Sequence, residues 1–385
     1  GDQMADYHLP GAFSFSTLGS SSMLIEIESS KAMAHAVKVA SRFCEKRSNR
    51  PSWELIMFEL SPDGYLYAHC HNARSELRLV VPGNGTLTPI DKQRFLMRSE
   101  LIANVVGACE EPSMLFSVSE STLTVRWAGT EYELITSDVE FTSVEPFDCR
   151  SYAMLQPRDF LETIRRVAFC TDDGGGKYNL DSIYAAIDGD DLVVEASDGR
   201  SAIRTKCKCV KLGNIKGFEI PKDAVKYLDA FVAASPSESM LQVGFDDRVH
   251  LRHGNSTARI LVDSGKRPDL DRFFKIPDAN EVHVDSSELL AAVNQIYSLL
   301  DVETMGCRID VDNLTMKLSA GKSTITLNCM SQWTFGLTID CQILRTFLSG
   351  TPANTEICFY FVGDTDPLHI LYGETHFLVM PMQVK

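Results

Sequence analysis

The sequence predicts an α+β protein made of three copies of one domain, and two observations support this fold class. An amphipathic helix pattern recurs six times, with helix starts near positions 29, 91, 157, 221, 286 and 340. Strand patterns separated by polar turns fill the segments between the helices. Six occurrences at a near-equal spacing of about 60 residues indicate an internal repeat of one helix plus several strands.

The repeat is clearest over residues 154–204. Pro157 suits the first turn of a helix, because proline lacks an N–H that this turn leaves unbonded. Apolar residues then follow the spacing of one helical face, at Phe160, Leu161, Ile164, Val167 and Ala168. Apolar runs on both sides of Asp188-Gly189 predict a β-hairpin at that turn.

The other five helices are predicted from the same pattern. Their predicted starts are Ser29, Asp91, Pro221, Ser286 and Asp340. The first is expected to run through Phe43. The second is expected to turn Phe95, Leu96, Ile102 and Val106 inward. Strand pairs are predicted between helices, among them 55–60 with 65–69 and 242–245 with 249–253.

Pairing adjacent units divides the chain into three domains. They cover residues 23–148, 149–277 and 278–385, with short proline-bearing junctions between them. Residues 1–22 are predicted to form a leader, for which disorder and a partial expression tag are both open.

Composition restricts the class of protein. The chain has 385 residues, a net charge of −15 and 44% apolar residues, which is typical of a globular protein. No apolar run approaches the roughly 18 residues that a membrane helix needs. The first 22 residues lack a secretory signal. Eleven cysteines without regular spacing favour reduced thiols. We therefore expect a cytoplasmic protein with no membrane partner.

Basic residues are concentrated on particular helices. On the first helix, Lys31, His35, Lys38, Arg42 and Lys46 form one stripe opposite the apolar face. The residues predicted to meet phosphates on this basis are Lys31, Lys38, Arg42, Lys46, Arg50, Arg94, Arg98, Arg165, Arg166, Lys222 and Lys226. In a chain of charge −15, this segregation suits a surface that meets phosphates without reading sequence. Ordinary solvated helix faces are the alternative. The fifth helix has no basic residue, which weakens the prediction there.

Three landmarks together resemble one family. Residues 192–204, 266–273 and 376–385 (LVVEASDGRSAIR, KRPDLDRF and HFLVMPMQVK) resemble the bacterial sliding clamp, the β subunit of DNA polymerase III. The resemblance extends from about Met23 to the end of the chain.

The resemblance implies both a fold and a function. Each of the three clamp domains would pack two helices on antiparallel sheets, and two chains would close head to tail into a dimeric ring. The ring would encircle duplex DNA as a processivity factor and tether the replicative polymerase. A clamp loader and other proteins with clamp-binding motifs would be further partners. No cofactor and no catalytic activity are implied.

The resemblance also implies a cleft for partner peptides between the second and third domains. Its residues would be Leu180, Ser197, Gly199, Arg200, Ala202, Pro268, Arg272, Phe273, Leu378, Met380, Pro381 and Met382. Flexible methionine side chains suit many peptides because they repack around different partners. The alternative for Met380 and Met382 is that they fill gaps in the core.

Further positions carry over from the family. Lys177 and Tyr178 would contact DNA, and Leu299 and Leu300 would lie at the dimer interface unless they are ordinary core leucines. The chain departs from the family at Arg200-Ser201-Ala202, where His-Arg-Leu is usual, and at Phe273. The preferred peptide is therefore expected to differ.

Motifs for other functions are incomplete. Gly321-Lys322-Ser323 is similar to the end of a phosphate-binding loop, but Met316 occupies the position of a required glycine. The segment is also predicted to join two strands. His69-Cys70-His71 and Cys207-Lys208-Cys209 each lack a second ligand pair nearby, so no metal is predicted.

Two rival functions remain. The chain could be a clamp-like paralogue that acts as a protein-binding scaffold, which the lack of basic residues on the fifth helix suggests. It could also be an enzyme with a pocket between domains. An enzyme would need a convergent set of titratable groups, and the sequence shows none.

Overall fold

The computed structural model describes residues 23–62, 64–86, 93–146, 149–172, 178–234, 238–262, 265–276, 278, 280–300 and 305–382. The chain separates into two compact units, Gly1–Pro146 and Phe147–Lys385. The first predicted domain boundary lies next to the boundary between these units. The predicted second and third domains both fall in the second unit, so the three-domain division stays a prediction. The predicted leader lies outside the described residues. Among the described helices, none has the length and apolar character to span a membrane.

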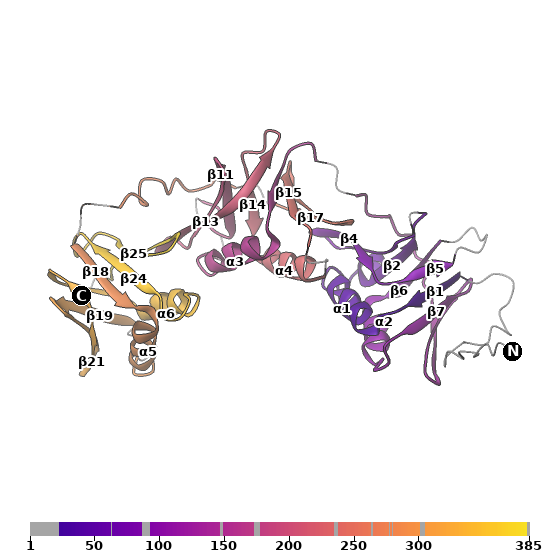
Figure 1. The fold of residues 1–385 in the computed structure, drawn as a ribbon, viewed down its shortest axis with the longest axis horizontal. Helices are drawn as coiled ribbons and strands as arrows, with labels where there is room; N and C mark the ends of the chain where they lie inside the picture. Colours follow the sequence, from indigo (N-terminus) through magenta and orange to yellow (C-terminus); the bar gives the residue numbers. More distant parts are fainter. Residues whose placement is uncertain are drawn as a thin grey trace, which may run out of the picture. The chain divides into compact units, whose positions relative to one another are not determined.

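In the part of the first unit that the structure describes, two α-helices pack on antiparallel sheets (Figure 1). The helices are α1 (Ser30–Ser41) and α2 (Ser99–Gly107), which lie side by side. One sheet has the strand order β5 (Asn84–Thr86), β1 (Met23–Ile27), β7 (Met114–Val118), β8 (Thr122–Trp127) and β9 (Thr130–Ile135). The other contains β6 (Arg94–Arg98), β2 (Leu55–Leu60), β3 (Leu66–His71) and β4 (Ser75–Val81). A short 3₁₀ helix, Pro51–Glu54, precedes β2.

Helix α1 forms much as predicted. The Ser29 hydroxyl accepts a hydrogen bond from the Ala32 N–H at 3.3 Å, which satisfies one of the unbonded donors of the first turn. The helix ends at Ser41, two residues before the predicted end. Its buried face comprises Ser30, Met33, Ala36, Val37, Val39 and Ala40.

The prediction of a helix starting at Asp91 was wrong. Residues 94–98 form strand β6, and helix α2 begins only at Ser99. Phe95 and Met97 are buried while Arg94 and Arg98 are exposed, which is the two-residue alternation of a strand. Leu96, predicted to face the helix core, lies half-buried on this strand. Ile102 and Val106 are buried on α2 as predicted.

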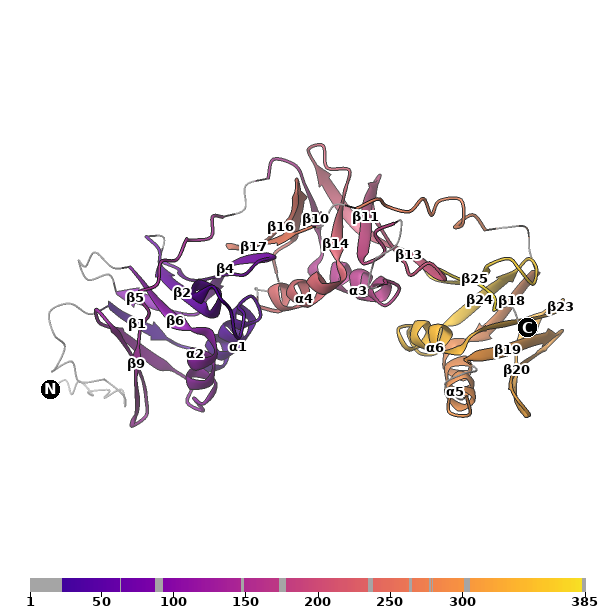
Figure 2. The ribbon, with the colours of Figure 1, turned by 180° about the vertical axis from the view of Figure 1, so that it is seen from behind.

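Among the described residues of the second unit, the α-helices form two adjacent pairs, α3 with α4 and α5 with α6 (Figure 2). Their bounds are α3 Pro157–Ala168, α4 Val225–Ala234, α5 Ser286–Tyr297 and α6 Cys341–Ser349. One antiparallel sheet joins β10 (Tyr152–Leu155), β13 (Ser201–Leu212), β15 (Leu241–Phe245), β16 (Arg248–His253) and β17 (Ser256–Leu261).

A longer antiparallel sheet continues from the other end of β13. In order, its strands are β14 (Gly217–Pro221), β11 (Ser182–Asp188), β12 (Asp191–Ser197), β13, β26 (Thr375–Val379), β25 (Leu368–Tyr372), β24 (Glu356–Phe361), β18 (Asn280–Asp285) and β22 (Met330–Ser331). A separate sheet holds β21 (Ser323–Asn328), β20 (Thr315–Ala320), β19 (Gly306–Asp312) and β23 (Thr334–Asp340).

Several local predictions are confirmed in the second unit. Helix α3 starts at Pro157 and buries the predicted apolar face except Ala168, which is half-buried. Asp188 pairs with Asp191 across a two-residue turn, where Gly189 has a φ of 59° that favours glycine. Gly321-Lys322 joins β20 to β21, which confirms a hairpin turn and not a phosphate-binding loop. Helix α4 begins at Val225, after a 3₁₀ turn at 222–224.

The structure describes all eleven cysteines and joins none of them in a disulfide. Six are buried, at Cys70, Cys170, Cys209, Cys307, Cys329 and Cys341. Five are half-buried, at Cys44, Cys109, Cys149, Cys207 and Cys358. Burial disfavours the charged thiolate and raises the pKa of Cys170 to about 12, which makes this thiol a poor nucleophile.

Asp285 is a suitable site to test helix capping. Its carboxylate accepts hydrogen bonds from the N–H groups of Ser287 and Glu288 at the start of α5, at 2.9 and 3.1 Å. Asp285→Ala should destabilise this helix by about 1 kcal/mol and raise hydrogen exchange of its first-turn amides about fivefold. The matched variant Asp285→Asn retains a hydrogen-bond acceptor, so its first-turn amides should exchange at nearly the same rate as those of the unmodified chain. Equal protection in the alanine variant would contradict the assigned cap.

Candidate functional site

The pairing of β13 with β26 brings two distant segments of the chain together. Ser201 lies opposite Val379, and Ala202 lies opposite Leu378. The pairing extends one residue further, because the Met380 N–H donates to the Arg200 carbonyl at 3.0 Å. Four predicted cleft residues therefore meet at one junction.

The turn before β13 is fixed by its own side chains. The Asp198 carboxylate accepts hydrogen bonds from the N–H groups of Arg200 and Ser201, at 2.8 and 2.6 Å. Ser197 donates to the Ser201 carbonyl at 2.8 Å, and its oxygen accepts from the Gly199 N–H at 3.1 Å. Gly199 has a φ of 84°, which disfavours residues with a side chain. The Ser-Asp-Gly sequence therefore dictates this turn.

Two predicted residues lie on either side of this turn. A Cβ built on Gly199 would lie 3.6 Å from a methyl group of Leu180, so Leu180 packs beside the turn. The Arg200 side chain is 73% exposed, and its guanidinium lies 3.6 Å from the Asp340 carboxylate at the start of α6.

A small apolar cluster joins the segment 265–274 to the strand pair. Ala202, Leu270, Phe274 and Leu378 are buried against one another. Between Leu270 and Phe274 the chain makes a turn, closed by a hydrogen bond from the Phe273 N–H to the Leu270 carbonyl at 2.9 Å. This cluster therefore fixes the segment that carries the predicted residues Arg272 and Phe273.

Three large apolar side chains of the predicted set are exposed. The exposed fractions are 39% for Phe273, 43% for Met380 and 40% for Met382. These fractions do not fit the alternative in which the two methionines fill gaps in the core. The Met382 N–H donates to the Thr338 carbonyl at 2.7 Å, which holds the tail against β23. Pro268 and Pro381 are half-buried.

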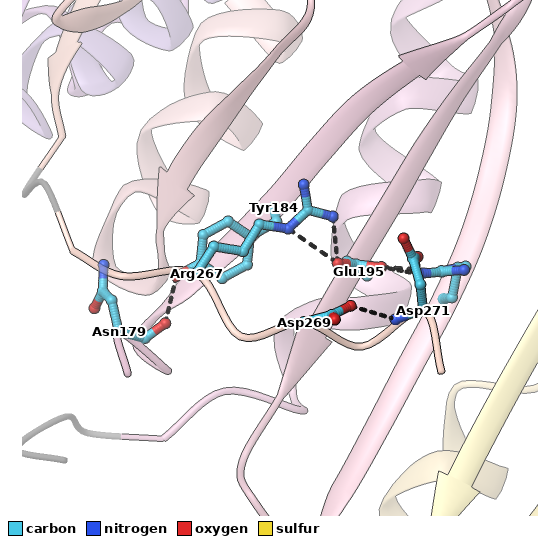
Figure 3. Close-up of polar contacts among 7 residues, drawn as sticks. Asn179, Tyr184, Glu195, Arg267, Asp269 and Asp271 are labelled. Atoms are coloured by element: carbon cyan, nitrogen blue, oxygen red, sulfur yellow. Dashed lines mark hydrogen bonds and ion pairs between the residues drawn. The ribbon is translucent and has the colours of Figure 1, made fainter. Parts of the chain in front are cut away.

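A buried carboxylate anchors the segment 265–274 (Figure 3). Glu195 on β12 is 1% exposed and accepts hydrogen bonds from Arg204 at 2.6 and 2.9 Å and from Arg267 at 3.1 Å. Arg204 also bonds Asp271 at 2.5 Å. A charge this deeply buried is costly unless paired, so the two arginines hold Glu195 and the segment together.

Sequence reasoning missed this ion cluster. Glu195 stands between Val194 and Ala196 in an apolar run, and a charge inside a buried strand is a signal that a partner exists. Arg204 lies opposite Glu195 in the strand pairing, but the position of Arg267 depends on tertiary structure. The Arg267 guanidinium lies 5.4 Å from the ring centre of Tyr184, whose hydroxyl donates to the Asn179 carbonyl at 2.5 Å.

A histidine pair lies on β25 and β26, next to the same junction. His376 on β26 is opposite Arg204, and its Nε2 lies 2.9 Å from Nδ1 of His369. Burial, with contributions from His369 and Arg204, lowers the pKa of His376 to about 4. The unfolded chain therefore binds this proton more readily, so the stability that the neutral imidazole contributes declines as pH falls from about 6.5 towards 4.

The predicted DNA contacts are mostly exposed. Lys31, Lys38, Arg42, Lys46, Arg50, Arg94, Arg98, Arg165, Lys222 and Lys226 are exposed, whereas Arg166 and Tyr178 are half-buried. Lys177 lies outside the described residues. Lys31, Lys38 and Arg42 form the predicted stripe along α1, opposite its buried face. Because β6 replaces the expected helix start, Arg94 and Arg98 lie on a strand and not on a helix.

Some of these cations have protein partners. Arg98 pairs with Glu54 and Arg165 with Asp229, both at 3.0 Å. Exposed pairs of this kind contribute at most about 1 kcal/mol, so a phosphate can replace the carboxylate.

Arg166 differs from these exposed cations. It donates to the Thr375 hydroxyl at 3.4 Å and lies 5.6 Å from the ring centre of Tyr372, which places it against the β25–β26 hairpin.

The predicted dimer residues differ in exposure. Leu299 is 57% exposed, which does not fit an ordinary core leucine, and Leu300 is half-buried. Asn294 and Gln295 on the preceding helix α5, and its C-cap residue Ser298, face solvent as predicted. Leu299 is therefore the stronger candidate of the two for an interface.

Comparisons with solved structures identify the fold. In sequence comparisons, no protein-family model and no curated protein matches the chain. A DNA polymerase III beta subunit from Thermotoga maritima aligns over 94% of this chain and 100% of its own, with a TM-score of 0.81 and 17% identity. A sliding clamp from Pseudomonas aeruginosa, solved bound to griselimycin, aligns over the same fractions with a TM-score of 0.82 and 15% identity. A sliding clamp from Caulobacter crescentus aligns over 95% of this chain and 100% of its own, with a TM-score of 0.77 and 14% identity.

These likenesses define a class of protein by its fold. The chain has the fold of the DNA polymerase III beta sliding clamps, as the sequence resemblance predicted. It reaches this fold with few of their residues in common.

The Glu195 cluster gives a prediction about the segment 265–274. Glu195→Ala leaves the partly exposed Arg204 and Arg267 without the anion that they share, and should lower the free energy of unfolding by about 2 kcal/mol. Hydrogen exchange over residues 265–274 should increase in parallel. The control is Glu162→Ala, which removes an exposed i,i+4 pair with Arg158 and should change stability by less than about 0.5 kcal/mol. A similar small change in both variants would show that Glu195 does not anchor the segment.

Proposed function

We propose that this chain is a DNA polymerase processivity factor. Two copies close into a ring around duplex DNA and tether the replicative polymerase and other proteins that carry clamp-binding motifs. The observation that carries this proposal is the beta sliding clamp fold over 94% of the chain. In this function the ring acts by topology, in the cytoplasm, and needs neither cofactor nor catalysis.

The surface of the chain supports the partners of this proposal. Exposed lysines and arginines on α1, such as Lys31 and Lys38, suit the phosphates of duplex DNA in a chain whose net charge is −15. The exposed side chains of Phe273, Met380 and Met382 suit the apolar residues of a partner peptide. The exposed Leu299 suits closure of the ring by a second copy. A clamp loader would open that interface.

A second candidate function is a clamp-like paralogue that serves as a protein-binding scaffold. Helix α5 favours it, because its solvent-facing side carries no basic residue. On α6, Arg345 donates to the Asn294 side chain at 2.7 Å and lies 4.6 Å from the ring centre of Tyr297. A scaffold would keep peptide binding and lose topological linkage to DNA.

Loading onto DNA separates the two functions. With an active clamp loader and ATP, the chain should remain on nicked circular DNA and be lost when that DNA is linearised, because only a closed ring is held by topology. The measurement is the amount of protein that co-elutes with each DNA during gel filtration. Equal retention on both forms would contradict the ring and favour the scaffold.

Leu299→Asp provides the matched test of closure, because a carboxylate at an apolar interface is costly to bury. It should reduce retention on the circular DNA severalfold. Leu314→Asp introduces the same charge at a leucine that is 66% exposed and outside the predicted interface, and should retain loading. If both variants load alike, Leu299 is not at the interface.

Replacing Met380 and Met382 together by alanine should weaken binding of a clamp-binding-motif peptide at least tenfold. Truncating large side chains at the centre of an interface commonly costs about 1 kcal/mol or more each. Fluorescence anisotropy of a labelled peptide from the replicative polymerase provides the measurement. The control is Met330→Ala, because Met330 is 59% exposed but lies on β22. Unchanged peptide affinity in the double variant would refute this binding site.

A further inference from the structure

A cysteine, a histidine and a glutamate converge on the solvent face of the sheet formed by β18 and β24. His283 on β18 lies directly opposite Cys358 on β24. Glu281 precedes His283 by two residues and therefore points to the same face. The opposite face is filled by buried residues of the core, Val282, Val284, Ile357 and Phe359. The three side chains are thus placed by the register of a regular strand pair.

The three ligand atoms are within coordination distance of a common point. The Glu281 carboxylate lies 3.1 Å from the Cys358 sulfur and 3.1 Å from His283 Nε2, and the sulfur lies 4.0 Å from the same nitrogen. In a tetrahedral zinc site the ligand atoms are about 3.4 to 3.6 Å apart, given the usual zinc–ligand bond lengths. The observed separations lie on either side of these values, so small side-chain shifts would complete the site.

Two further side chains support these ligands from outside. The other ring nitrogen of His283, Nδ1, lies 3.2 Å from the Glu356 carboxylate. Metal-bound histidines commonly donate their second N–H to a carboxylate, which orients the ring. The Tyr360 hydroxyl donates to Glu281 at 3.1 Å. A plain surface ion pair would not require a carboxylate on both sides of one imidazole.

We propose that Glu281, His283 and Cys358 bind a Zn²⁺ ion on this sheet face, with Glu356 and Tyr360 orienting the ligands. Sulfur, nitrogen and oxygen ligands together suit Zn²⁺ and not Mg²⁺ or Ca²⁺, which prefer oxygen alone. Three protein ligands leave one position for water or for a group from another molecule. The site is independent of the proposed processivity function.

Charge balance is compatible with binding. The Cys358 thiol now donates a hydrogen bond to Glu281, and on coordination its S–H bond is replaced by an S–Zn bond with release of the proton. One thiolate and one carboxylate then neutralise the two charges of Zn²⁺, and the imidazole is neutral. The ligands lie near the surface, with His283 30% and Glu281 46% exposed, so the ion has access from solvent.

A second group of possible ligands, Cys149, Asp246 and His250, is a weaker candidate. The Asp246 carboxylate already accepts hydrogen bonds from the Asp247 and Arg248 N–H groups at 2.6 and 3.0 Å, and lies 2.8 Å from His250 Nε2. These bonds commit it to its own turn. This group supplies a matched control for the experiment.

No metal is predicted from the sequence, because no two pairs of possible ligands lie close together along the chain. Glu281 and His283 have the i, i+2 spacing that places both on one strand face, but the third ligand comes from β24. Only the pairing of His283 with Cys358 unites them.

Cobalt substitution tests the site in the full-length chain after chelator treatment. Co²⁺ should bind with a thiolate-to-metal charge-transfer band and the visible bands of tetrahedral Co²⁺, and Zn²⁺ should displace it. Cys358→Ser should lose the charge-transfer band, and Cys149→Ser should retain it. Glu356→Gln retains all three ligands and should keep the band while lowering Zn²⁺ affinity about 10- to 100-fold.

Circular dichroism of each variant establishes that it is folded. Absence of the charge-transfer band in the unmodified chain, or its persistence in Cys358→Ser, would overturn the proposal. Zn²⁺ affinity equal to that of the unmodified chain in Glu356→Gln would remove the support from the orienting carboxylate and count against the site.

Discussion

The pairing of β13 with β26 is the interaction on which the candidate site depends. The first residues of β13 pair with β26, its middle pairs with β12 and its last residues pair with β10. One strand therefore joins two sheets. Arg200 and Met380 meet only because of this ladder, and Ala202 and Leu378 are buried only when it is formed. A binding surface for peptides here would be as rigid as the sheet that carries it.

Charge is used in two physically different ways in this acidic chain. The Glu195 carboxylate is buried and paired with the partly exposed Arg204 and Arg267, so its geometry is fixed and the loss of its partners is costly. Apart from the half-buried Arg166, the predicted DNA-contacting cations along α1 and α3 are exposed, and those with partners hold them only weakly. Exposed cations can exchange a carboxylate for a phosphate, whereas the buried cluster cannot change partners without unfolding its surroundings.

The sequence allowed prediction of those features that depend on local pattern. The buried face of α1, the start of α3 at Pro157 and the turn at Gly189 all follow from short-range periodicity or turn chemistry. The secondary-structure prediction failed in the region before Ser99, because adjacent apolar residues such as Phe95 and Leu96 fit a helix as well as a strand. Only pairing with β2 decides between them.

The candidate site was predictable to a lesser degree. Its residues were named through resemblance to a family, since no local pattern relates position 200 to position 380. The Glu195 cluster and the Glu281 group were missed because their members come from separate strands and loops.

The distribution of thiols has a practical consequence. Every native cysteine is buried or half-buried, so a cysteine engineered on an open surface should react fastest with a maleimide fluorophore, and the native cysteines need not be removed before such labelling.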